Sequence, residues 1–224
     1  MIVVVGLPAY ADSPAGSSPD DEKCAGGMVV EVAAAAKRRG AQVELVGKVG
    51  EDGAGDAVVL ALGRLGIGHA ALLRDPVRPT PVLTAGSSAA DDSAEVDADT
   101  PVPTVFPANL AERPALDAAD IELALRYLPQ SSVIVLTDPL AEGALAVAVD
   151  AAAFATARLV VVVAAGAPPP EVSAEATVLE APVDDDGSFG RLVGTFAAGL
   201  DAGKEPAAAF REAVAASGWE SAAD

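Results

Sequence analysis

The chain of 224 residues carries 33 acidic and 14 basic residues, and its net charge of −19 argues against nucleic acid or an anionic membrane as a partner. Hydrophobic residues make up 51% of the sequence, enough for a sizeable core, but aromatic residues make up only 4%. Ala, Val and Leu must therefore fill the interior of one domain of ordinary size. The single cysteine, Cys24, excludes an intramolecular disulfide and a thiolate metal cluster.

The first residues are typical of a buried strand rather than of a targeting signal. Ile2–Val5 is an unbroken β-branched run that ends at Gly6 and has no basic start. The apolar run Leu159–Ala167 is too short to span a bilayer. We therefore expect a cytoplasmic protein with no membrane partner.

The stretch from Cys24 to Leu65 predicts a helix, a strand, a glycine-rich turn and a second helix. The first helix follows Gly26-Gly27 and ends at Gly40, with basic residues in its last turn where the helix dipole favours them. A strand is predicted at 43–46 and the second helix at about 54–65. This is the repeating unit of an α/β domain.

Further along the chain, buried-type strands alternate with helices. Strands are predicted at 132–137 and 159–164, with a short one at 176–179, and helices at about 117–128, 141–157, 188–202 and 206–217. The single histidine, His69, is predicted to lie in a connection. Because segments of helical length join the strands, the sheet should be mostly parallel with right-handed crossovers. The prediction is an α/β fold, a three-layer sandwich with helices on both faces of the central sheet.

Glycines recur at fixed offsets in the first part of the chain. Small residues stand at Gly26, Gly27, Ala33, Gly40 and Gly50. This pattern resembles the amino-terminal signature of the ribokinase-like (PfkB) family of carbohydrate and nucleoside kinases. Residues 46–55 are similar to the family's V-G-x-V-G-x-D-x-x-G turn, and Pro79-Thr80-Pro81 resembles its Pro-Thr-Gly lid motif. The resemblance implies a single ribokinase-like domain over 1–224, with a small antiparallel β lid formed by residues 10–24 and 72–106.

The resemblance also implies where a sugar or nucleoside would bind. The family's substrate-binding Asn falls on Glu31, whose carboxylate accepts hydrogen bonds but, when ionised, cannot donate them. A solvent-facing helical Glu is an equally good interpretation of Glu31. The family's sugar-contacting acid falls on Ala11, one residue before Asp12. The implied substrate-binding positions are Asp12, Gly26, Gly27, Glu31 and Asn109.

Residues 184–196 can be aligned with the family's D-T-x-G-A-G-D-x-F-x-x-x-F motif, whose glycines form an anion hole at a helix start. Gly187 and Ser188 stand at the implied anion hole, but Phe189 replaces its middle glycine, which we expect to obstruct it. Gly190 stands where the family has its catalytic Asp, so no catalytic residue is assigned there. The family's Asn-x-x-Glu and Thr-x-Gly-x-x-Gly motifs are missing from 168–183.

These departures predict a shortened ribokinase-like homologue without phosphotransfer activity, which binds a small sugar or nucleoside ligand or a protein partner. Proline-broken edge strands in the lid also predict a homodimer. No cofactor and no metal site are expected. The alternative is an active ATP-dependent carbohydrate or nucleoside kinase that uses ATP, Mg²⁺ and a relocated base, Asp184 or Asp186. A Rossmann nucleotide-binding module is disfavoured, because Gly6 stands alone after the first strand.

Overall fold

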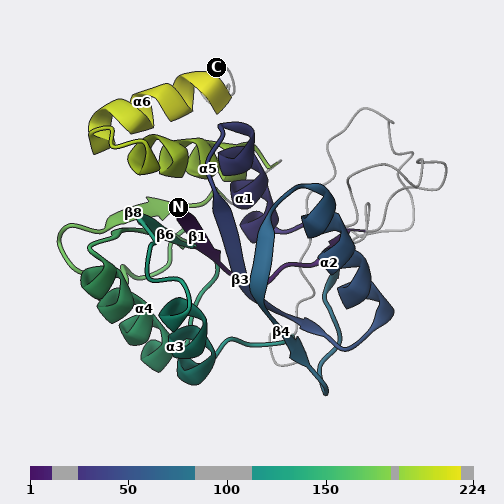
Figure 1. Ribbon diagram of the computed structural model, residues 1–224. Helices are drawn as coiled ribbons and strands as arrows, with labels where there is room; N and C mark the ends of the chain where they lie inside the picture. The colour runs from purple at the N-terminus through teal and green to yellow at the C-terminus, as the bar shows by residue number, and fades with distance from the viewer. Residues whose placement is uncertain (12–24, 84–112, 183–186, 218–224) are drawn as a thin grey trace, which may run out of the picture.

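The computed structural model describes residues 1–11, 25–83, 113–182 and 187–217. The centre of this described part is a six-stranded, all-parallel sheet with the order β4-β3-β1-β6-β7-β8 (Figure 1). The strands are β1 (Ile2–Val5), β3 (Val43–Gly50), β4 (Gly68–Asp75), β6 (Val133–Leu136), β7 (Arg158–Val163) and β8 (Thr177–Glu180). β1 lies in the middle of the sheet, and all four of its side chains are fully buried.

Helices cover both faces of the sheet, as predicted. One face packs against α1 (Met28–Arg38), α2 (Gly53–Arg64) and α5 (Ser188–Asp201), with α6 (Pro206–Ser217) lying against α5. The other face packs against α3 (Ala118–Arg126) and α4 (Glu142–Ala155). Alternate residues of β1 serve the two cores: Ile2 and Val4 face α1 and α5, whereas Val3 and Val5 face α3 and α4. The predicted three-layer α/β sandwich is therefore confirmed.

Most predicted elements are found within a few residues of their expected bounds. Asp117 caps α3, because its carboxylate accepts a hydrogen bond from Asp120 N at 2.8 Å. The interpretation of His69 was wrong: this residue lies in β4, which pairs with β3 at the edge of the sheet. Gly68 to Ala71 contains no β-branched residue, so strand propensity gave no sign of the strand.

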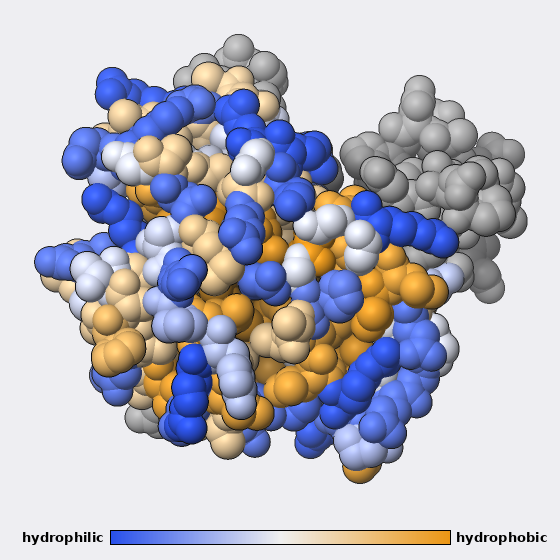
Figure 2. All heavy atoms as spheres, in the orientation of Figure 1, coloured by the Kyte–Doolittle hydropathy of each residue, from blue (hydrophilic) through white to orange (hydrophobic). Residues whose placement is uncertain are grey.

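In Figure 2, hydrophobic side chains gather in the middle of the view, over β3 and β4.

A small second sheet is formed by β2 (Tyr10–Ala11) and β5 (Val82–Leu83). These strands pair in parallel, so the expected antiparallel direction of the lid was wrong. Local sequence could not give the direction, because it depends on where the chain returns after β4. Residues 72–75, expected in the lid, belong to β4 in the central sheet. Residues 12–24 and 84–106 lie outside the described residues.

Glycines bring α1 and α5 unusually close together. A Cβ atom added at Gly194 would lie 2.3 Å from Val32 O and 2.7 Å from Ala35 Cβ. No side chain fits between the two helices at this point, because the nearest atom, Val32 O, belongs to the backbone and cannot turn away. The middle parts of α1 and α5 are therefore in close contact.

The described residues contain no helix that is both long enough and apolar enough to cross a membrane. Within the same ranges, no group of three or more His, Cys, Asp or Glu side chains is placed to hold a metal ion.

Candidate functional site

The carboxyl ends of β1 and β6 meet at the point where the chain changes direction across the sheet. From β1 the chain runs through α1 to β3 on one side, and from β6 it runs through α4 to β7 on the other. Ligands of open α/β sheets bind in the crevice outside the strand ends at such a switch point. The segments that follow the two strands, Gly6-Leu7 and Thr137-Asp138, are therefore the first candidates for a binding site.

Asp138 is the acidic group at this point. Its Oδ2 atom accepts a hydrogen bond from Leu7 N at 2.9 Å and lies 3.1 Å from Thr137 Oγ1. Gly6 makes room for this arrangement, since a Cβ atom there would lie 2.4 Å from Asp138 Oδ2. A Cβ at Gly6 would also come within 3.0 Å of Val29 Cβ, so the start of α1 borders the same place. The carboxyl is thus fixed between β1, β6 and α1.

Burial raises the pKa of Asp138 above its ordinary value, although the hydrogen bonds from Leu7 and Thr137 and the charge of Arg113 act in the opposite direction. Burial in turn lowers the pKa of Arg113, and the charge of Asp138 opposes that shift. An acid and a guanidinium in a partly desolvated place are suited to hydrogen bonding with the hydroxyl groups of a ligand. The sequence interpretation missed both residues. The available signal was the pair Thr137-Asp138 directly after a buried parallel strand.

Glu31 lies in the first turn of α1 and reaches the start of α5. A Cβ atom added at Gly187, the N-cap of α5, would lie 2.6 Å from Glu31 Oε2 and 3.1 Å from Oε1. The half-buried Glu31 carboxylate is therefore packed directly against the first residues of α5, where Gly187 and Ser188 were predicted to form an anion hole. That role stays a prediction, but the structure does bring these three predicted residues together.

The stem of the same side chain fills the space beside Gly190. A Cβ atom there would lie 2.6 Å from Glu31 Cβ and 3.4 Å from Met28 Sδ. Phe189 packs into the core with 4% of its surface exposed, and its expected obstruction of the anion hole stays a prediction. Glu31 is thus the side chain of α1 that packs against Gly187 and Gly190 at the start of α5.

The glycine pair joins this region to the small sheet. Gly26 forms an antiparallel bridge with Ala9, and Gly27 caps α1 with a φ of 93°, a conformation that favours glycine. A Cβ atom at Gly26 would lie 2.9 Å from Leu83 Cδ1 in β5. The remaining predicted site residues, Asp12, Asn109, Asp184 and Asp186, lie outside the described residues.

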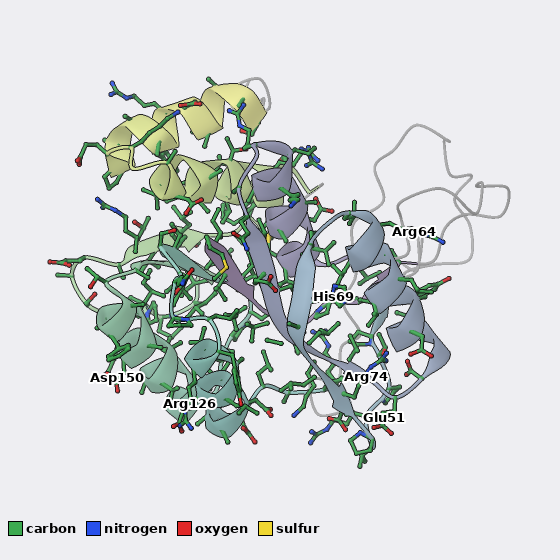
Figure 3. The ribbon with its side chains drawn as sticks, viewed as in Figure 1. Glu51, Arg64, His69, Arg74, Arg126 and Asp150 are labelled. Atoms are coloured by element: carbon green, nitrogen blue, oxygen red, sulfur yellow. The ribbon has the colours of Figure 1, made fainter. Side chains whose placement is uncertain are left out.

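The glycine-rich turn and the Pro-Thr segment are joined by one carboxylate. Asp52 accepts hydrogen bonds from Gly55 N at 2.7 Å, from Thr80 N at 2.8 Å and from Thr80 Oγ1 at 2.7 Å. Thr80 Oγ1 accepts one from Gly50 N at 2.9 Å, and Arg74, visible beside this turn in Figure 3, donates one to Gly50 O at 2.9 Å. Burial would raise the pKa of Asp52, but the hydrogen bonds from Thr80 and Gly55 and the charge of Arg74 outweigh it and lower this pKa.

A separate cavity of about 400 Å³ lies between α3 and α4. Its lining includes Ser131 and Ile134, at the start of β6, so it opens at the opposite end of the strands from Asp138. Arg126 and Asp150 border it from the two helices (Figure 3), and Phe154 at its edge is 88% exposed. None of the predicted site residues lines this cavity.

The sheet order, the two helical layers and the small second sheet define a ribokinase-like fold, the fold of the PfkB carbohydrate kinases. The crystal structure of Sa239 superposes with a TM-score of 0.67 at 14% identity, covering 96% of this chain and 92% of that one. Ribokinase from Arabidopsis thaliana, complexed with ribose and ATP, superposes with a TM-score of 0.63 at 17% identity. The match covers 96% of this chain and 90% of that one.

An uncharacterized sugar kinase from Pyrococcus horikoshii gives a TM-score of 0.54 at 16% identity, over 73% of this chain. The match spans just 55% of that kinase's length. No family model matches the sequence, and no curated protein matches it. At these identities the structural likeness defines the fold, and the activity has to be argued from the site.

Proposed function

We propose that this protein binds a small hydroxyl-rich ligand, a sugar or a nucleoside, at the carboxyl edge of its sheet without transferring phosphate to it. The observation that carries the proposal is the packing at Gly190. A side chain at this position would meet Glu31 Cβ at 2.6 Å, so α1 fills the space that the family's catalytic Asp would need. General-base assistance of that kind is typically worth about 10²–10⁴-fold in rate.

The binding half of the proposal is supported by the switch point. Asp138 lies next to the ends of β1 and β6, and the charge of Arg113 acts on its carboxyl group. Ribokinase from Arabidopsis thaliana, which shares the fold, is described as a complex with ribose and ATP. A ligand rich in hydroxyl groups matches both partners, since each hydroxyl both donates and accepts hydrogen bonds.

ATP with Mg²⁺ is the group that the fold family implies, and the start of α5 does not fit its phosphates. A carboxylate is already packed against Gly187 there, and a phosphate group in the same place would be repelled by it. We therefore expect no cofactor. A single domain over residues 1–224 and a cytoplasmic location stay predictions.

Thermal unfolding in the presence of a panel of sugars and nucleosides tests binding. At least one neutral ligand should raise the melting temperature, because binding to the folded state stabilises it. Asp138→Ala should lose that rise. Asp150→Ala, on α4 at the separate cavity between α3 and α4, is the matched control and should keep it (Figure 3). The proposal is contradicted if no ligand of the panel raises the melting temperature, or if Asp138→Ala shows the same increase as the unsubstituted protein.

Measured ATP consumption against the same panel tests the absence of transfer. We expect no turnover in the protein, and none in Gly190→Asp, because the new side chain collides with Glu31. The alternative is an active kinase with a base at Asp184 or Asp186. Turnover that disappears in Asp184→Asn or Asp186→Asn would establish that alternative and overturn the proposal.

We also infer a homodimer that forms through the β2–β5 sheet. Val82 in β5 is 42% exposed, and Val77, in the turn after β4, is 86% exposed. Within the described residues this sheet has only two strands, and a short sheet with exposed apolar side chains near it favours association with a second copy.

A further inference from the structure

The start of α5 is closed by an acidic side chain of the protein itself. Resting on the function proposed above, we propose that Glu31 makes the site select against anionic ligands, because its carboxylate takes the place at the start of α5 that a phosphate would need. The ligand class is thereby narrowed to uncharged sugars or nucleosides, and their phosphorylated forms are excluded.

The physical argument starts from the helix. α5 is 14 residues long, and the N–H groups of its first turn point out of its N-terminus with a partial positive charge. Such a place favours one negative group. Both Glu31 carboxylate oxygens lie close to Gly187, at 2.6 and 3.1 Å from the position of an added Cβ atom. A second anion would face the like charge of Glu31 in a half-buried place, where screening by solvent is reduced.

The backbone holds Glu31 in this position. α1 cannot move away from α5 without losing the close contact at Gly194, where Val32 O would meet an added Cβ at 2.3 Å. The stem of Glu31 rests on Gly190 in the same interface. Gly190 therefore has a second consequence besides the absence of a base. Because it has no side chain, it leaves room for Glu31 to pack against the N-terminus of α5.

The test uses inorganic phosphate as the probe, with thermal unfolding of the whole protein at matched ionic strength. Glu31→Gln keeps the shape of the side chain and removes its charge. We expect phosphate to leave the unsubstituted protein unchanged and to raise the melting temperature of Glu31→Gln saturably, by about 3–6 °C at about ten times the dissociation constant. Glu122→Gln, a 60% exposed position on α3, makes the same change in net charge and should show no rise.

Two results would overturn the inference: an equal phosphate-dependent rise in the unsubstituted protein, or no rise in folded Glu31→Gln. Should Glu31→Gln fail to fold, Glu31→Ala gives the same readout, because it removes the carboxylate and the stem together. The two proposals fail in different ways. ATP turnover by the unsubstituted protein overturns the proposed function, whereas an inactive protein whose Glu31 variants ignore phosphate overturns this inference alone.

Discussion

Asp52 is the residue on which the turn before α2 depends. It accepts hydrogen bonds from Gly55, in the first turn of α2, and from Thr80, which follows β4 in the chain. Three hydrogen bonds to one carboxylate strongly favour its ionised form. The same carboxylate therefore caps a helix and fixes the entry of the chain into β5.

Asp52→Asn should destabilise the protein by about 2 kcal/mol at pH 7, since an amide cannot accept from both Thr80 N and Gly55 N with the two different atoms that the carboxylate uses. Urea unfolding measures this loss. Asp56→Asn is the matched control: Asp56 is 70% exposed and pairs with Arg74 at the surface, so its loss should cost at most about 1 kcal/mol. Equal losses in the two variants would contradict the role of Asp52.

The pH dependence of the same variant is a second prediction. The pKa of Asp52 is lower in the folded protein than its ordinary value of 3.8. Its stabilisation is therefore fully present above pH 3.8 and is lost as the pH falls through the lower, folded pKa. The difference in unfolding free energy between the protein and Asp52→Asn should shrink below that pH. A difference that stays constant down to acid unfolding would show that the charge is not involved.

At the level of single residues, sequence predicted the glycines better than the charges. Gly26, Gly27 and Gly187 lie where the motifs placed them, because turns and close approaches restrict the choice of residue locally. The partnership of Glu31 with Gly190 could not be predicted, because it depends on how closely α1 and α5 pack. Asp138 needed the order of strands in the sheet, which no local pattern contains.

Among the elements, the α1–α5 pair depends most on small residues. Gly190 and Gly194 lie one turn apart on α5 and face α1 at distances that exclude a side chain. Helix propensity alone would favour Ala at both positions. The glycines therefore indicate packing and not flexibility.

Gly194→Ala should destabilise the protein by about 1–3 kcal/mol, despite the better helix propensity of Ala, because the new methyl group would meet Val32 O at 2.3 Å. Gly63→Ala is the control on α2: its Cβ would have its nearest neighbour, His69 Cε1, at 3.8 Å, and it should stabilise by up to about 1 kcal/mol. Chemical denaturation of both variants measures the change in unfolding free energy, which should be a loss for Gly194→Ala and a gain for Gly63→Ala. A stabilised Gly194→Ala protein would mean that the helices separate easily.

Element types were predictable from apolar runs and caps, whereas pairing was not. The valine-rich strands β1, β6 and β7 have the β-branched composition of strands buried on both faces. β4 lacks such residues and is a strand because β3 offers it an edge. The parallel direction of β2 and β5 likewise follows from the path of the chain through β4.

For the molecule as a whole, the net charge of −19 opposes self-association, while the exposed apolar side chains of Val82 in the small sheet and Val77 in the turn after β4 favour it. We expect light scattering at micromolar concentration to give twice the monomer mass, more completely at higher salt, because salt screens the repulsion. Val82→Asp should give a monomer. Phe154→Asp, at an 88% exposed position on α4, should leave the dimer intact. A monomer at all salt concentrations would rule out the dimer.

The central position of β1 has a consequence for synthesis of the protein. β1 pairs with two neighbouring strands, β3 and β6. β3 is translated soon after β1, but β6 is translated only after α2, β4 and α3. Until Val133–Leu136 emerges from the ribosome, one backbone edge of Ile2–Val5 stays unpaired, and apolar side chains that are fully buried in the folded protein stay exposed. A nascent chain in this interval is open to aggregation, so ribosomes that pause before Val133 should hold a product that depends on chaperones.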